Sequence, residues 1–179
     1  MRLIAIFFMF SLLMNQALAY SAFGICNYGK ENLPSIICSG PSVLVGTIIS
    51  KDVKIAGELK ANKITVGANL NVAGAVQMND SKIVGPTTII GSLEAKNVDF
   101  QKGIQIEADS ITLNHTVVRG SMIITSKINK PYLRLYCSTT ITGAVIFDEK
   151  EGVIEVSEES IVQGKIVNGT MEFVRKSCD

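Results

Sequence analysis

A period of 17 residues runs through the middle of the chain and constrains its fold more than any other feature. Gly57, Gly74 and Gly91 are 17 residues apart, and each is followed by one residue and then by an apolar one. Gly103 and Gly120 show the same separation of 17 residues. A fixed period of this length is typical of repeat architectures, in which each unit stacks on the one before it.

A faster rhythm lies inside this period. Short apolar-x-apolar triplets start about every six residues between Val53 and Met122, so three triplets make one unit. Each triplet predicts a three-residue strand with two side chains on one face and one on the other. The residues between the triplets are Gly, Asn, Asp, Ser and Lys, which turn the chain or remain solvated.

The simplest structure with three short strands per unit is a three-sided parallel β-solenoid whose coils share one apolar core. Composition agrees, because the chain contains 23 Ile and 16 Val, which favour strands. A β-sandwich or barrel is the alternative, but its strands usually run to about 5–6 residues. We expect these inward pairs: Val53/Ile55, Ile64/Val66, Leu70/Val72, Val76/Met78, Leu93/Ala95, Val98/Phe100, Ile104/Ile106 and Ile111/Leu113. The expected outward residues are Lys54, Lys60, Thr65, Asn71, Gln77, Glu94, Asp99, Gln105 and Thr112.

The repeat becomes irregular after Ser126, where the spacing between successive glycines lengthens. Gly120 and Gly143 are 23 residues apart, and Gly143 and Gly164 are 21 apart. We interpret this as an inserted corner loop. The predicted organisation is a signal peptide at 1–19, an N-terminal cap segment at 20–42, a solenoid at 43–170 with the insert at 127–136, and a C-terminal tail at 171–179.

The first 19 residues have the layout of a secretory signal peptide. A basic start at Arg2 precedes the apolar run Leu3–Met14, and Ala17-Leu18-Ala19 is a small-x-small cleavage site. The run is short for a membrane span, and an uncleaved N-terminal anchor is the alternative. We therefore expect a secreted or periplasmic protein with no membrane span after cleavage.

All four cysteines follow the predicted cleavage site, and an even number in an exported chain favours two disulfides. Four cysteines allow three pairings, of which we favour Cys26–Cys38 and Cys137–Cys178. A metal site is the alternative, but the chain has no Cys-x-x-Cys and only one histidine. Without residues 1–19 the charges balance at 16 basic and 16 acidic, which argues against a general nucleic-acid binder.

The glycine-centred units resemble the bactofilins, a polymer-forming cytoskeletal family of bacteria. The residues that carry the resemblance are 53–61, 70–76 and 89–95. The resemblance implies a right-handed β-helix without enzyme activity that assembles end to end into filaments, here in an exported variant. A second resemblance is to the left-handed hexapeptide-repeat acyltransferases, through 66–71 and 84–89, although the steps vary between five and seven residues.

Few residues suggest chemistry. His115, the only histidine, is a general base in the acyltransferase interpretation, but its place between two triplets is typical of a corner residue. Six acids between Asp148 and Glu159 form either a cation site or a solvated loop, and we favour the loop. Tyr132, Arg134 and Tyr136 are a candidate contact surface or a lid over the core. We expect no catalytic, cofactor-binding or metal-binding residues.

The sequence thus favours an exported, non-enzymatic scaffold that associates with itself through its solenoid ends. The alternative is a secreted binding module that contacts an extracytoplasmic protein or a glycan with a solenoid wall and the 127–136 insert. An acyltransferase ranks third, since it depends on His115 and fold analogy.

Overall fold

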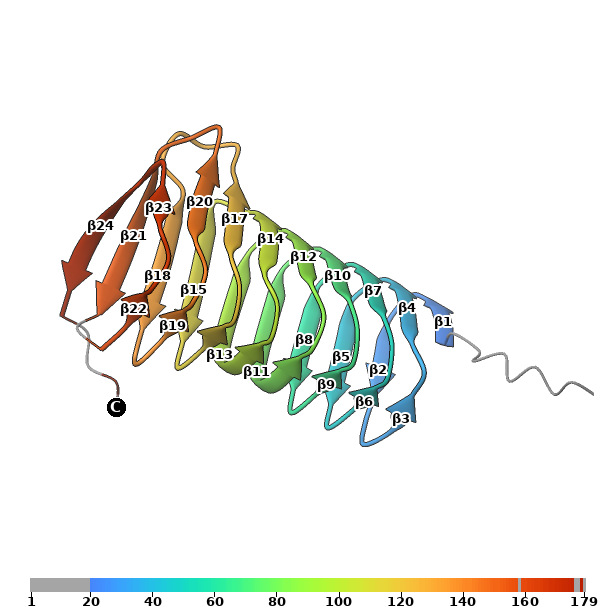
Figure 1. Ribbon diagram of the computed structural model, residues 1–179. Helices are drawn as coiled ribbons and strands as arrows, with labels where there is room; N and C mark the ends of the chain where they lie inside the picture. Colours follow the sequence, from blue (N-terminus) through green and yellow to red (C-terminus); the bar gives the residue numbers. More distant parts are fainter. Residues whose placement is uncertain (1–19, 158, 176–177, 179) are drawn as a thin grey trace, which may run out of the picture.

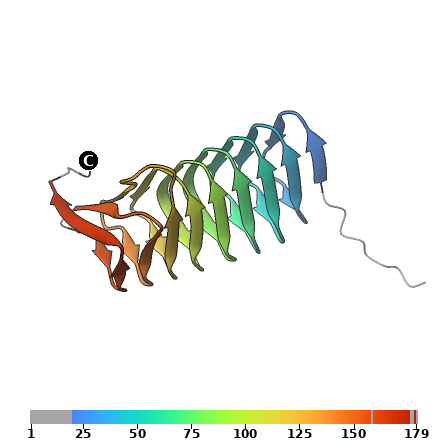
Figure 2. The ribbon, with the colours of Figure 1, turned by 90° about the horizontal axis from the view of Figure 1, so that it is seen from above.

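The computed structural model describes residues 20–157, 159–175 and 178, and every regular element in them is a β-strand. The strands are short and stack in parallel along one axis, so that the chain advances from one end to the other (Figures 1 and 2). The prediction of a three-sided parallel β-solenoid is confirmed. The predicted signal peptide, residues 1–19, lies outside the described residues.

Three ladders of parallel strands form the three sides. Face 1 consists of β1 (Tyr20–Phe23), β4 (Ile36–Ser39), β7 (Val53–Ala56), β10 (Leu70–Ala73), β12 (Thr87–Ile90), β14 (Ile104–Glu107), β17 (Met122–Thr125), β20 (Val145–Asp148) and β23 (Ile166–Val167). Face 2 consists of β2 (Cys26–Tyr28), β5 (Ser42–Val45), β8 (Leu59–Asn62), β11 (Val76–Ile83), β13 (Leu93–Phe100), β15 (Ser110–Asn114), β18 (Tyr132–Tyr136), β21 (Gly152–Ser157) and β24 (Gly169–Val174).

Face 3 is narrower, and it includes the last residues of β11 and β13, which continue around a corner from face 2. Its other strands are β3 (Asn32–Leu33), β6 (Ile48–Ile49), β9 (Thr65–Val66), β16 (Val117–Val118), β19 (Thr140–Ile141) and β22 (Ile161–Val162). The register reproduces the sequence period, since Val53, Leu70, Thr87 and Ile104 lie opposite one another in four successive coils.

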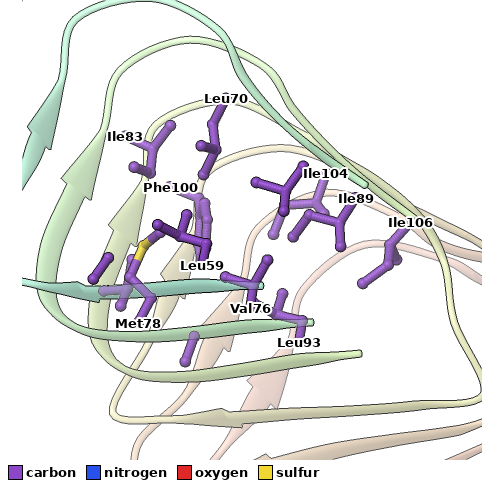
Figure 3. Packing of buried hydrophobic residues seen from close by; sticks show 14 of the residues in the cluster. Leu59, Leu70, Val76, Met78, Ile83, Ile89, Leu93, Phe100, Ile104 and Ile106 are labelled. Carbon is purple, nitrogen blue, oxygen red and sulfur yellow. The ribbon is translucent and has the colours of Figure 1, made fainter. Parts of the chain in front are cut away.

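The core is a set of columns in which each apolar side chain stacks on its counterpart in the next coil. All eight predicted inward pairs are buried, including Val66 and Phe100 at 0% exposure. Figure 3 shows Leu59, Met78 and Phe100, which come from three successive coils, all pointing into the interior. The predicted outward residues are exposed or half-buried. One coil cannot bury these side chains alone, so the core depends on stacking.

A column of glycines lets consecutive coils approach closely at the corner between faces 1 and 2. A Cβ built on Gly57 would lie 2.5 Å from the carbonyl carbon and oxygen of Gly40 in the preceding coil. A Cβ on Gly74 would likewise collide with the carbonyl of Gly57. The 17-residue glycine spacing therefore has a steric cause, because backbone rather than a flexible side chain occupies the space.

The corner between faces 2 and 3 is made differently. Lys63, Asp80, Asn97 and His115 occupy this corner in successive coils, all with φ between 47° and 56°. Inward hydroxyls follow this column and accept hydrogen bonds from the backbone of the adjacent coil, as between Ile64 N–H and Ser81 Oγ at 3.2 Å. The hydroxyls that accept in this way are Ser81, Thr116, Thr139 and Ser160, whereas Thr47 at the equivalent position donates to the carbonyl of Gly29 at 2.7 Å. The apolar triplets of the sequence do not predict these buried hydroxyls.

The solenoid extends further toward both ends of the chain than the sequence pattern predicts. Residues 20–42 contain β1 to β4, of which β1, β2 and β3 form the first coil and β4 begins the second, so this segment is part of the solenoid. The inserted loop covers 126–131 only, because Tyr132–Tyr136 is a strand of face 2. Residues 171–174 likewise belong to β24 rather than to a tail.

Candidate functional site

The C-terminal end of the solenoid exposes core positions. Phe173 on β24 lies in register with Val156, which lies in register with Leu135. Val156 and Leu135 are 1% and 0% exposed, but Phe173 is 75% exposed. Their positions in the column are equivalent, so the difference arises because the described residues place no further coil over Phe173. The inward residues Val162, Ile166 and Met171 of the same coil are only partly buried.

The N-terminal end differs, because the inward residues of β2 and β3 are buried. Cys26 and Cys38 are each 2% exposed and form a disulfide across the core, joining face 2 to face 1. Tyr28 and Leu33 are 7% and 8% exposed. Phe23 is 92% exposed, but it lies in register with the outward Ser39. The two ends are therefore unequal, and core positions are exposed at the C-terminal one.

The second disulfide, Cys137–Cys178, confirms the favoured pairing and ties the chain after β24 back to an earlier coil. Cys137 follows β18, which is separated from β24 by the intervening strand β21. The crosslink thus holds the last coil against the two coils before it. Two disulfides indicate an oxidising, extracytoplasmic environment.

The structure brings Tyr132, Arg134 and Tyr136 together on the outer surface of β18. The Arg134 Nε donates to Glu155 Oε2 at 3.1 Å, and its guanidinium carbon lies 5.4 Å from the centre of the Tyr132 ring. The Tyr136 hydroxyl donates to the same Glu155 oxygen at 2.8 Å. Burial, and then Glu155, raise the pKa of Tyr136, so its hydroxyl remains protonated at neutral pH. These side chains form a bonded cluster across two coils.

The acidic stretch is distributed over several elements. Asp148 ends β20, Glu149 has a φ of 68° in the following loop, and Glu155 faces outward from β21. Glu158 lies outside the described residues. In the part of the chain that the structure describes, no three His, Cys, Asp or Glu side chains are grouped closely enough to hold a metal ion.

His115 occupies the left-handed corner column described above, with a φ of 47°. Its backbone N–H donates to the carbonyls of Tyr136 and Cys137 in the next coil. Its exposed ring is 2.8 Å from Asn114 Oδ1 through Nδ1. Asn, Asp and His adopt this backbone region more readily than most residues do. The left-handed backbone conformation of the corner therefore accounts for a histidine at position 115.

This corner role predicts how the stability responds to substitution of His115. We expect His115→Asn to change the free energy of unfolding by less than about 0.5 kcal/mol, because asparagine accepts the same backbone conformation. His115→Val should cost about 1–2 kcal/mol, since a β-branched residue is strained there. Urea unfolding followed by circular dichroism measures both. Equal losses for the two variants would contradict the corner role.

Comparison with known proteins identifies no relative: no protein-family model, curated protein or solved structure matches this chain. Within the described residues, no helix is long and apolar enough to cross a membrane.

Proposed function

We propose that this protein is an exported, non-enzymatic scaffold that associates with copies of itself through the C-terminal end of its solenoid. The observation that carries the proposal is the 75% exposure of Phe173 at a core position. Burying a phenylalanine is worth about 1.5–3 kcal/mol, so a surface that covers it gains this free energy.

The backbone of the last coil supports the same proposal. Among the described residues, β22, β23 and β24 each pair with a strand on one side only. An unpaired strand edge offers N–H and C=O groups that another chain can pair with. A solenoid must cap such an end or present it to another molecule. The unpaired strand edges and the exposed apolar side chains together suit a second copy of this chain, whose C-terminal end offers the same groups.

Export is supported by the two disulfides and by the signal-peptide pattern of residues 1–19. The resemblance to bactofilins is compatible with a scaffold that carries no catalytic group. His115 occupies a corner of the solenoid through its backbone conformation and backbone hydrogen bonds, which gives the acyltransferase interpretation little support.

Substituting Phe173 by glutamate tests the proposal. We expect Phe173→Glu to weaken self-association at least ten-fold, because a charge at this position opposes burial, and ten-fold corresponds to about 1.4 kcal/mol. Sedimentation velocity over a concentration series measures the association. Ile48→Glu is the matched control, since Ile48 is 51% exposed and points outward from β6 on face 3, away from the C-terminal end.

The wild-type protein should form oligomers at micromolar concentration, and Ile48→Glu should leave them intact. A monodisperse monomer at all concentrations would contradict the scaffold and favour the secreted binding module instead. Equal weakening by both substitutions would show that the C-terminal end is not the contact.

A further inference from the structure

The outer surface of face 1 collects exposed apolar side chains. Ile37, Ile90, Ile123 and Val167 point outward from β4, β12, β17 and β23 and are between 37% and 54% exposed. A shallow apolar hollow lies on the same surface, between Ile37 and Ile90, with Ala56 and Ala73 at its base. Exposed apolar surface of this kind is typical of contact sites.

Face 1 is also poor in charge, unlike face 2. Its outward charged residues are Lys54, Glu107 and Asp148, spread over nine strands, and Glu107 is already paired with Lys127 of the inserted loop at 2.9 Å. Face 2 carries charged outward residues in most of its coils, including the bonded pair Arg134 and Glu155. Removing face 1 from water therefore involves little desolvation of charge.

We propose that a second copy of this chain packs on face 1, sheet against sheet, with its solenoid axis reversed. Such a pair has two-fold symmetry, in which the same surface is used by both copies. β12 is the fifth of the nine strands of face 1, so full overlap places the axis at β12. Ile90 of one copy then meets Ile90 of the other, and Ile37 meets Ile146.

Charge complementarity selects the reversed arrangement. The positive residue Lys54 is on the third strand of face 1, whereas Glu107 and Asp148 are on the sixth and eighth. Reversal places Lys54 over the stretch between these two acids of the second copy. If the two solenoid axes pointed the same way, each strand of face 1 would lie opposite the same strand of the second copy. Lys54 would then face Lys54, and neither acid would lie opposite a lysine of this face. Electrostatic complementarity of this kind fixes the register of an interface.

The area is sufficient for a specific but modest interface. Nine strands about 4.8 Å apart and four residues wide make a surface of about 40 Å by 13 Å. The two copies together bury about 1,000 Å², which is the lower limit for a specific interface. This contact is independent of Phe173, which lies on face 2 at the end of the solenoid.

Crosslinking at the symmetry axis tests the proposal. We expect a short bis-maleimide to crosslink Ile90→Cys into a dimer, because only a residue at the axis comes close to its own copy. Sheets packed face to face lie about 10 Å apart, which is too far for a direct disulfide. Gln77→Cys is the matched control, an exposed outward residue on face 2. Both variants are made in the full chain with Phe173→Glu, which removes association through the C-terminal end. Intact mass and non-reducing gels measure the yield.

At least a ten-fold higher dimer yield from Ile90→Cys than from Gln77→Cys supports the proposal. Equal yields would overturn it, and this result leaves the end contact at Phe173 unaffected. If the dimer forms only with the native Phe173, the crosslink depends on the end contact, and the face 1 interface is wrong.

A charge exchange tests the register. We expect Lys54→Asp to weaken the face 1 dimer at least five-fold, since each contact occurs twice in a symmetric pair. Adding Asp148→Lys to the same chain should restore part of the loss. Sedimentation equilibrium in the Phe173→Glu background measures both. If the double variant is as weak as Lys54→Asp alone, the reversed register is wrong.

Discussion

Gly74→Ala should destabilise the solenoid by at least about 3 kcal/mol, because the added methyl group meets backbone on the adjacent coil. A Cβ on Gly74 collides with the carbonyl group of Gly57 and lies 3.1 Å from the backbone nitrogen of Glu58. Backbone atoms in a continuous ladder cannot rotate away as a flexible side chain does. The coils must therefore separate locally, which breaks inter-coil hydrogen bonds and opens the core beneath them. Urea unfolding by circular dichroism measures the change.

Gly29→Ala is the matched control for this prediction. A Cβ on Gly29 has nothing within 4 Å, so the same methyl group enters open space. We expect its free energy of unfolding to stay within about 0.5 kcal/mol of wild type. A Gly74→Ala variant as stable as Gly29→Ala would show that the close approach of the coils is not required.

Phe100→Ala should cost about 3–5 kcal/mol, which is the usual range for removing a buried phenylalanine. Phe100 is 0% exposed and points into the interior, in register with the buried Ile83 of the adjacent coil (Figure 3). Its position in the middle of the stack adds to the effect, because the stability of a solenoid depends on each interface between neighbouring coils. Thermal unfolding should show a fall in Tm of about 6–20 °C.

Phe173→Ala provides a comparison with the same chemical change at an exposed core position. Phe173 is 75% exposed, so its truncation should cost less than about 1 kcal/mol in the isolated molecule. The same variant should weaken self-association. If Phe100→Ala and Phe173→Ala destabilise the monomer equally, the C-terminal end is more buried than the structure shows.

The architecture and most of the core could be predicted from the sequence, which favoured the observed disulfide pairing but left two other pairings possible. Two apolar side chains in each short strand, such as Leu70 and Val72, must face one interior because side chains alternate along a strand. The 17-residue glycine spacing fixed the length of a coil for the reason that Gly57 and Gly74 illustrate. The architecture and the core follow from the local sequence pattern, and the pattern is easy to recognise because it recurs in every coil.

The candidate site was much harder to predict. Met171 and Phe173 carry the same apolar-x-apolar signal as the interior triplets, yet residues 171–179 were assigned to a tail. Tyr132–Tyr136 was similarly assigned to the insert, because the longer corner at 126–131 put its triplet out of phase. The apolar-x-apolar pattern continues past each break in the period and indicates both β18 and β24.

Only the tertiary structure decided which apolar residues are buried. Val156 and Phe173 have equivalent patterns in the sequence, but one is covered by a further coil and the other is not. The location of the Cys26–Cys38 disulfide inside the core, and the alignment of Ile37, Ile90, Ile123 and Val167 on one surface, also appear only when the coils are stacked. The physical reason is that exposure depends on what lies in the next coil, 17 or more residues away, and the described residues place no coil beyond β22, β23 and β24.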